Sequence, residues 1–545
     1  MNSIYLVILA FTLFYFGYKY YSQYISSKIF DLDDSNKTPA NEINDGIDYV
    51  PTNKHVLFGH HFTSIAGAAP IIGPCIAVFW GWVPAFLWVV IGTIFMGAVH
   101  DFGALVLSLK EKGNSVADIS ANVINKRIRI MFLCFVMCLT WLVLAVFANA
   151  IASLFTMYGT AVIPVNIEIF IAVIMGYLIY KKNINAFIPS IIALLILYLF
   201  IWIGANNPLN LDSIGISNIK GTWIIILFIY SSVASIIPVW ILLQPRDYIN
   251  SHQLIVGLIL IYLSIFIAQP NIIAPPITNL KTGPPIIPFL FVTIACGAIS
   301  GFHGLVSSGT TSKQLNKIKD ARIIGYGATL GEGLLALAAT IAAVAGVSFI
   351  ESSGCLPWSC DFKSASGSAL TIFINGSSGL LQQIGLSESI SITLIVVLIV
   401  SFAATTLDSA TRIQRYIITE FGTALNINFL KNKYIATMTS VIPAYIIATN
   451  DSLRNELWQT FGASNQMLAA LTLMIISIYF WNKGKNILPF VIPMIIVMII
   501  AIWALIIKFN QSSTFLLKFI NGTLIVLIFW MIIEGFIDIR KKIND

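Results

Sequence analysis

One acidic residue, Asp101, lies inside a strongly apolar segment, where a carboxyl group needs a partner or a task. It belongs to segment 83–108, on a stripe of small and polar residues at helical spacing that includes Thr93, Gly97 and Ser108. Such a stripe faces protein rather than lipid, and a charged side chain at mid-bilayer costs about 2.5–3.5 kcal/mol. We therefore expect Asp101 to bind a proton or to take part in gating. Pairing with a basic neighbour near the inner surface is the alternative.

A second acid, Glu332, occupies a similar stripe together with Gly325, Ala328 and Ala336. The stripe predicts packing against other helices. A protonatable carboxyl group at this depth is a candidate proton carrier.

Three histidines add groups that titrate near neutral pH. His60 and His61 lie about one turn inside one end of segment 56–80, and His303 lies deeper in segment 286–309. Adjacent residues point about 100° apart on a helix, so His60 and His61 cannot face the same cavity. We expect at least one of them to act in gating and His303 to contact the substrate or a proton. The alternative for the pair is an interfacial position with hydrogen bonds to loops.

Two further pairs of polar residues have spacings that suggest local structure. Arg412 follows Asp408 by four residues, which predicts a structural ion pair on one helix. Ser307 and Ser308 could supply hydroxyl ligands to a sodium ion, although helix packing by small residues is the alternative.

Cys355 and Cys360 lie in a segment, 350–387, that we expect to be an outer loop, where an oxidising environment favours a disulfide. The other four cysteines lie in apolar runs without metal-ligand spacing and are read as packing residues. No metal site and no cofactor are expected.

The composition places all of these residues in a membrane protein. Of the 545 residues, 57% are apolar and 10% are charged, against about 45–50% and about 25% in soluble domains. Apolar runs of spanning length recur along the whole chain and predict about fifteen transmembrane helices in an all-α polytopic protein. They cover residues 2–24, 56–80, 83–108, 129–158, 162–180, 186–204, 222–243, 253–268, 286–309, 322–349, 388–411, 434–449, 457–481, 487–507 and 516–537.

The distribution of basic residues predicts the orientation of these helices. An odd number of spans puts the termini on opposite sides, and with the N-terminus outside most of the 31 Lys and Arg residues face the cytoplasm. The net charge of +7 therefore marks inner loops and gives no indication of nucleic-acid binding. We expect a multi-pass protein of the bacterial inner membrane, in contact with lipid, with a cytoplasmic C-terminus.

Two spans contain helix-breaking residues at comparable depth. Span 56–80 has a Gly/Pro cluster at 67–74, and span 222–243 has Ser231, Ser235 and Pro238. Their separation by five spans is typical of two inverted repeats with a substrate site between discontinuous helices. The predicted substrate-binding residues are Ser64, Gly67, Ala68, Ser231, Ser235 and His303.

This pattern divides the chain into four parts. They are an N-terminal helix with a cytoplasmic linker (1–55), a first five-helix repeat (56–204), a second (205–420) and accessory helices (421–545).

Seven stretches resemble the carbon starvation protein A (CstA) family of bacterial peptide and pyruvate transporters. They are FGHHFTSIAGAAPIIGP at 58–74, GAVHDF at 97–102, LLQPRDYIN at 242–250, CGAISGFHGLVSSGTTSK at 296–313, ARIIGYGATLGEG at 321–333, TTLDSATRIQRYI at 405–417 and FGASNQMLAALTL at 461–473. The resemblance implies a LeuT-like core of five plus five helices with additional helices, coupled to an ion gradient. The sequence departs from the family pattern at Ala69, Ser312 and Ile318, where members usually carry Gly, Pro and Glu.

The function expected from these features is secondary active import of a small carboxylate-bearing nutrient, a short peptide or pyruvate, linked to carbon starvation. No P-loop is present, so an ion gradient must supply the energy. One charge crossing 100 mV supplies about 2.3 kcal/mol, which makes proton symport sufficient. Sodium coupling in the same fold is an alternative, and so is a membrane redox enzyme that binds haem or a metal through histidines.

Overall fold

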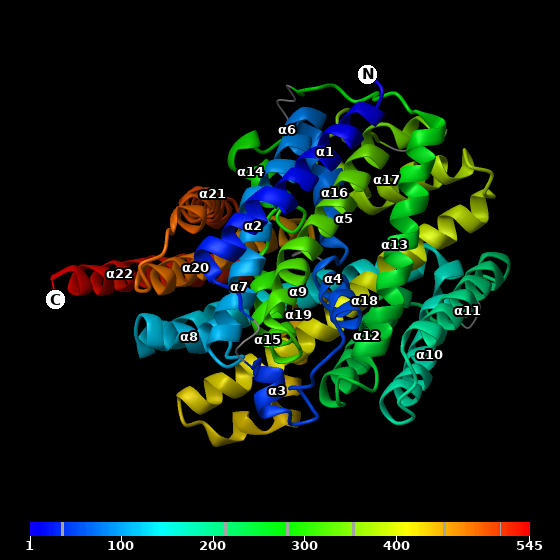
Figure 1. Ribbon diagram of the computed structural model, residues 1–545. Coiled ribbons are helices and arrows are strands. Elements are labelled where there is room, and N and C mark those ends of the chain that lie inside the picture. Colours follow the sequence, from blue (N-terminus) through cyan, green and yellow to red (C-terminus); the bar gives the residue numbers. More distant parts are fainter. Residues whose placement is uncertain are drawn as a thin grey trace.

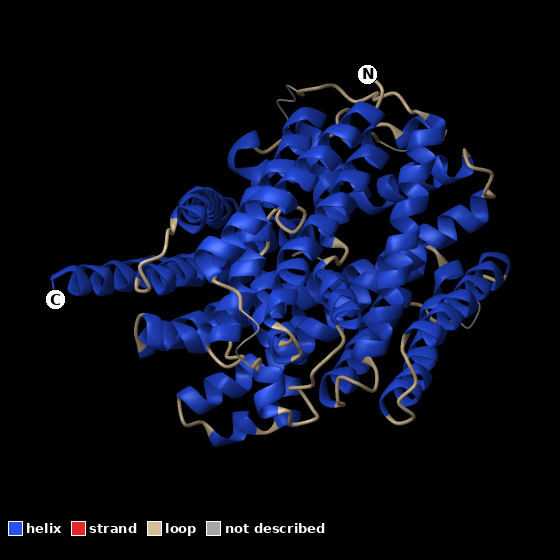
Figure 2. Cartoon of the chain, viewed as in Figure 1, coloured by secondary structure: helices blue, strands red, loops and turns tan. Residues whose placement is uncertain are grey.

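The computed structural model describes residues 1–33, 37–210, 215–278, 283–350, 355–450, 454–512 and 514–544, and nearly all of these are helical (Figure 2). Within these ranges there is no β-strand, and two isolated backbone bridges join Asn2 to Asn271 and Thr52 to Leu315. The predicted all-α class is confirmed.

The helices follow one another with short connections. In the first half they are α1 (Ile4–Phe16), α2 (Ser22–Tyr24), α3 (Pro39–Ile43), α4 (Lys54–Ile65), α5 (Ala69–Ala77), α6 (Trp82–Leu87), α7 (Ala98–Lys110), α8 (Val116–Val123), α9 (Lys126–Met157), α10 (Val162–Tyr180), α11 (Phe187–Asn206), α12 (Ile219–Ile236) and α13 (Leu243–Ala268). In the second half they are α14 (Ile286–Thr293), α15 (Gly301–Gly309), α16 (Ala328–Val344), α17 (Phe362–Gln382), α18 (Glu388–Ala424), α19 (Lys433–Thr449), α20 (Arg454–Trp481), α21 (Leu488–Gln511) and α22 (Phe515–Asn544). Wider or tighter turns join α1 to α2, extend α2 to Phe30 and join α6 to α7.

Twelve helices of the described chain are long and apolar enough to cross a membrane, and the bent pair α4 and α5 brings the number to 13. Two more of the predicted spans correspond to α19, which has 17 residues, and to α14 with α15, which are separated by residues 294–300. Helices α19, α14 and α15 are each too short, as continuous helices, to cross the membrane alone.

The first break lies where the sequence predicts it. The axis bends by 43° between α4 and the helical segment Ala69–Trp80. Pro70 has no N–H, so the carbonyl of Ala66 lacks its helical donor four residues ahead.

The prediction of the second break in 222–243 is wrong. Helix α12 continues through Ser231 and Ser235 to Ile236, and Pro238 lies in the turn that leads to α13. The second break is instead at 294–300, between α14 and α15. Its run of small residues, Ala-Cys-Gly-Ala, interrupts the apolar pattern without a proline, so periodicity did not reveal it.

Glycines hold neighbouring helices close to this second break. A Cβ on Gly73 of α5 would lie 2.5 Å from the carbonyl oxygen of Thr293, and one on Gly97 would meet the carbonyl oxygen of Ala298. On the other side, Gly462 of α20 lies against the carbonyl of Val292. Close backbone approach through small residues is the main source of helix association where lipid removes the hydrophobic driving force.

The degree of burial separates a core from a periphery. In α20 every residue of the most apolar stretch is buried, whereas only 28% of that stretch is buried in the N-terminal helical segment Ile4–Phe30 and in α22. In Figure 1 the hairpin of α10 and α11 lies at one edge of the molecule, and α21 and α22 lie at the opposite edge. The outward-facing apolar residues of these helices are suited to lipid.

The segment expected to be an outer loop, 350–387, contains a long helix. Helix α17 packs against α5, α16 and α18 and buries Phe373 and Ile374. Its Ser and Gly residues hid its apolar face from the sequence pattern. A disulfide joins Cys355 to Cys360 just before this helix.

Candidate functional site

Asp101 lies at the centre of a buried group of polar side chains that we call the Asp101 cluster: His100, Asp101, His303, Thr329 and Glu332. One carboxylate oxygen of Asp101 lies 2.7 Å from Nδ1 of His100. The other lies 2.9 Å from Nδ1 of His303 and accepts the Thr329 hydroxyl at 2.6 Å. Helices α7, α15 and α16 supply these side chains, all of which are at most 2% exposed.

Glu332 extends this cluster through His303. Its Oε1 lies 3.4 Å from Nε2 of His303, and neither of these two atoms has a hydrogen-bond partner in the described structure. His303 therefore lies between two carboxyl groups, one bound at Nδ1 and one near Nε2. This arrangement can pass a proton from one carboxyl group to the other through the imidazole ring.

His60 and His61 of α4 face different neighbours, as their angular separation of about 100° requires. Nδ1 of His60 pairs with Asp247 of α13, and Nδ1 of His61 lies 2.8 Å from the hydroxyl of Thr311, just after α15. Both histidines are fully buried. Helix α4 thus separates two polar regions, one toward α13 and one toward α15.

The region toward α13 forms a second buried group, which we call the Arg246 cluster: His60, Glu168, Tyr230, Arg246, Asp247 and Asp408. The Arg246 guanidinium donates to Glu168 at 3.0 Å, to the Tyr230 hydroxyl at 2.8 Å and to Asp408. Helices α10, α12, α13 and α18 meet at this one side chain.

The predicted ion pair between Asp408 and Arg412 is wrong. Asp408 pairs with Arg246, while Arg412 donates to the carbonyl oxygen of Ala234 at 2.9 Å and to that of Ile237. These carbonyls lie at the C-terminal end of α12, where a cation is favoured. Asp408 and Arg412 therefore bind partners on other helices and not each other.

The substrate-binding residues predicted at the first break are enclosed by α18 and α9. The Ser64 hydroxyl lies 3.3 Å from that of Ser409. A Cβ on Gly67 would lie 2.5 Å from the Thr406 hydroxyl and 2.8 Å from the Phe147 ring. Ala68 is also buried. Gly67 is thus required for close packing in this conformation.

Ser231 and Ser235, the other two serines predicted to bind substrate, form hydrogen bonds within α12 and to α19. The Ser231 hydroxyl donates to the Phe228 carbonyl at 3.3 Å, and that of Ser235 lies 3.5 Å from the Thr437 hydroxyl of α19. Because α12 is unbroken here, their hydroxyls serve its own backbone and its contact with α19.

Asn465 of α20 stabilises the second break, and the sequence did not single it out. Its Oδ1 accepts the backbone N–H of Phe302 at 2.9 Å, at the start of α15, and its Nδ2 donates to the Ser300 hydroxyl at 2.8 Å. Gln466 donates to the carbonyl of Phe291 at 2.7 Å. Adjacent amides thus hold both ends of the interrupted helix.

The two serines considered for sodium differ in their surroundings. The Ser308 hydroxyl donates to the carbonyl of Gly304 at 2.8 Å, within α15. The Ser307 hydroxyl is buried without a partner among the described residues. Only Ser307 therefore has a free hydroxyl.

The linker before α4 covers the end of these clusters near Thr311. Thr52 donates its N–H to the carbonyl of Gln314 at 3.0 Å, and Asp48 accepts the Tyr416 hydroxyl. Lys313 lies over the rings of Tyr49 and Tyr416, at 5.6 and 5.0 Å. Burial lowers the pKa of Lys313, but these tyrosines and nearby acids outweigh it, so the pKa lies above its ordinary value and Lys313 stays charged.

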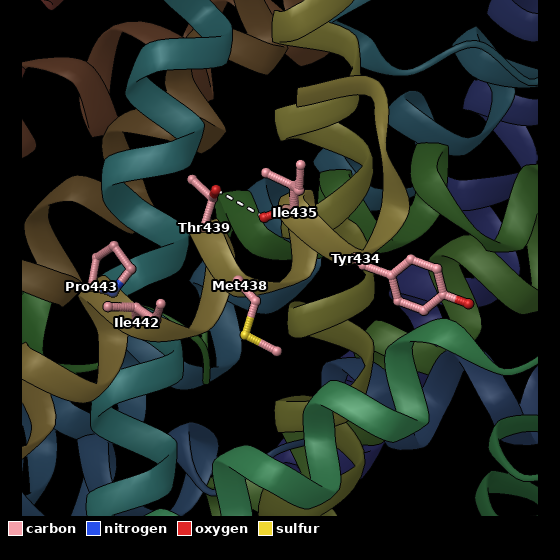
Figure 3. A pocket seen from close by; sticks show the side chains of 6 residues that line it. All are labelled: Tyr434, Ile435, Met438, Thr439, Ile442 and Pro443. Atoms are coloured by element: carbon pink, nitrogen blue, oxygen red, sulfur yellow. Dashed lines mark hydrogen bonds between the residues drawn. The ribbon is translucent and has the colours of Figure 1, made fainter. Parts of the chain in front are cut away.

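A surface groove of about 400 Å³ lies along α19 and is lined by Tyr434, Ile435, Met438, Thr439, Ile442 and Pro443 (Figure 3). Met438 and Ile442 are half exposed, and none of the six is a candidate site residue. Its apolar lining fits contact with lipid.

Several residues of the two clusters were missed for identifiable reasons. Arg246 and Asp247 fall between two predicted spans, but α13 begins at Leu243 and buries them. Glu168 is an acid within an apolar run, a signal that was available and not used. His100 is adjacent to Asp101 in the sequence and was not predicted to be a site residue.

Comparison with known proteins gives a consistent family. A family model described as carbon starvation protein CstA matches residues 2–352 and 361–504. The peptide transporter CstA of Bacillus subtilis is 30% identical, over 91% of this chain and 88% of its own. The pyruvate/proton symporter BtsT of Escherichia coli is 36% identical, over 63% of this chain and 49% of its own.

Among solved structures, a mutant manganese transporter of Eremococcus coleocola aligns with a TM-score of 0.50 and 14% identity, over 92% of this chain and 99% of that one. At this identity the likeness concerns the fold alone. The predicted LeuT-like architecture with additional helices is confirmed at that level.

Proposed function

The chain belongs to the carbon starvation protein CstA family, and from this premise we propose that it is a secondary transporter that imports a small carboxylate-bearing nutrient together with protons. Short peptides and pyruvate are the two candidate substrates, because relatives are named for each. The protein moves its substrate without converting it.

The observation that carries proton coupling is the Asp101 cluster. It contains two carboxyl groups and two imidazoles but no Lys or Arg, and it is fully buried. Its net charge therefore depends only on how many protons it holds. Since charge inside a membrane protein is costly, proton binding changes the free energy of any state that keeps the cluster away from water.

In the mechanism we propose, the two breaks hold the substrate and the Asp101 cluster senses the proton. The N-terminal ends of α5 and α15 lie at the breaks, where the helix dipole favours a carboxylate. His303 lies on α15 itself and contacts Asp101 of α7. Protonation of this pair removes the charge that opposes movement of α15 against α7, which permits the inward step.

For the repeats we propose boundaries that follow the observed breaks, in place of a division at residue 204. The first repeat combines residues 54–157 and 219–268, and the second covers 286–481. Helix α9 packs along α18, and α12 packs along α19. Helix α13 packs against α4 in the first repeat, and α20 packs against α15 in the second. The hairpin of α10 and α11 is then an insertion.

The orientation we propose places the N-terminus outside the inner membrane and the linker at 37–53 in the cytoplasm. Positive residues at the linker end of the clusters, including Lys313 and Arg412, support it. In this orientation the linker closes the inner side of the site.

Sodium coupling is the second candidate, and the unpartnered hydroxyl of Ser307 is the observation that favours it. The deciding experiment is uptake of labelled pyruvate and of labelled dialanine into proteoliposomes, with pH and sodium gradients imposed separately. We expect concentrative uptake under the pH gradient alone. Accumulation that requires sodium and ignores pH would overturn proton coupling.

A further inference from the structure

The Arg246 cluster contains more acids than the proton-coupling proposal uses. Five helices contribute its ionisable groups: His60 from α4, Glu168 from α10, Tyr230 from α12, Arg246 and Asp247 from α13, and Asp408 from α18. All except Tyr230 are at most 2% exposed. His60 of α4 faces this cluster, while the adjacent His61, about 100° away around the helix, faces Thr311.

The hydrogen bonds distinguish its carboxyl groups. Glu168 is satisfied on both oxygens, since one accepts Arg246 at 3.0 Å and the other accepts the Ser401 hydroxyl at 2.7 Å. On Asp408, Oδ2 accepts Arg246 and the Tyr230 hydroxyl. Its Oδ1 is buried and has no partner in the described structure. A buried anionic oxygen without a donor is strongly unfavourable.

The balance of charges in the Arg246 cluster also bears on Asp408. Three carboxyl groups, Glu168, Asp247 and Asp408, face one guanidinium and one imidazole. If His60 is protonated it neutralises Asp247, its direct partner, and Arg246 can neutralise only one of the other two acids. The next cation, Arg412, is directed to the end of α12 and to Asp48, 3.8 Å away. One negative charge therefore remains without compensation.

We propose that Asp408 is a second proton-binding site, with the proton on Oδ1, separate from the Asp101 cluster. Glu168 remains the anion that pairs with Arg246. Because the contact between Arg246 and Asp408 joins α13 to α18, loss of this proton strengthens that contact and gain of the proton weakens it. The site does not depend on the transport proposal, since it follows from the charge balance of the folded protein.

Infrared spectroscopy of the purified full-length protein tests the site directly. The C=O stretch of a protonated carboxyl group is resolved from that of a carboxylate. We expect wild type at pH 7 to show a protonated-carboxyl band that Asp408→Asn lacks. Glu168→Gln should lose this band as well, because Asp408 then ionises as the one anion beside Arg246. If Asp408→Asn keeps the full band, or wild type has none, the proposal is overturned. Loss of the band on exchanging KCl for NaCl would assign the oxygen to sodium and overturn it as well.

Thermal unfolding of the same variants gives an independent result. Asn resembles a neutral Asp in shape, so Asp408→Asn should melt close to wild type. Glu168→Gln forces Asp408 to ionise as the anion of Arg246 with Oδ1 left without a donor, so this variant should melt lower. If Asp408→Asn is as unstable as Glu168→Gln, or does not fold, Asp408 is the anionic partner of Arg246. Asp101→Asn, which lies in the other cluster, should leave the Asp408 band unchanged even if it abolishes transport.

Discussion

Replacing Asp101 by Asn should separate substrate movement from proton coupling. The carboxylate of Asp101 accepts three hydrogen bonds, at 2.6, 2.7 and 2.9 Å. The amide oxygen of Asn can accept two of them, while its NH₂ group faces the third donor. A lost hydrogen bond to a charged group costs about 1.5–3 kcal/mol, so we expect the variant to remain folded. A change of histidine tautomer can recover part of this free energy.

The effect on transport should be much larger than the effect on folding. One proton moving down a pH gradient of one unit contributes about 1.4 kcal/mol, or roughly tenfold accumulation of substrate. Asn cannot titrate, so accumulation in Asp101→Asn should fall to a ratio of about one, whatever the imposed pH gradient. Exchange of labelled for unlabelled substrate at equal concentrations should persist, because exchange needs no change in protonation.

The assay compares both activities in the same proteoliposomes, with Thr329→Val as the matched control. This variant removes one donor to Asp101 and keeps the carboxyl group, so accumulation should remain. Wild-type accumulation by Asp101→Asn would refute the role of Asp101 in coupling and return it to packing.

Three other changes test the surrounding structure. Arg246→Met leaves Glu168 and Asp408 without their buried cation and should cost about 3–5 kcal/mol, read as a lower melting temperature of the purified protein; an unchanged melting temperature would show that the pairs contribute nothing. Asn465→Ala uncaps α15 and should cost about 1 kcal/mol while lowering substrate-induced thermal stabilisation, and a variant that responds to substrate as wild type does would contradict its role at the break. A membrane-impermeant thiol reagent added outside intact cells should label Gly367→Cys, an exposed position in α17, and should not label Lys317→Cys. Wild-type protein gives the background labelling, and the reverse pattern would show that the proposed orientation is inverted.

The arrangement of the membrane helices could be predicted because lipid imposes long apolar runs, and these survive irregular boundaries. The position of the first break was also visible, since Pro70 and Pro74 remove backbone donors. The second break was assigned to the wrong segment. Pro238 only ends α12, and the true break at 294–300 depends on close contacts from Gly73 and Gly97, which are distant in the sequence.

The candidate site could be predicted only in part, because its partners come from different helices. Asp101, His303 and Glu332 were each selected for their own depth, and the structure places them within one cluster. Asp408 was paired with Arg412 because the two are neighbours on one helix, but Arg246 reaches it from α13. Sequence spacing describes contacts within a helix and not those between helices.

The most direct test of proton-coupled import is the flow of protons that substrate movement itself causes. A pH-sensitive dye inside proteoliposomes, with potassium and valinomycin holding the voltage at zero, reports this flow when pyruvate or dialanine is added outside without any imposed ion gradient. We expect the interior to acidify with wild type as substrate enters, and to stay constant with Asp101→Asn. Substrate entry into wild-type vesicles with no change of internal pH would contradict proton symport.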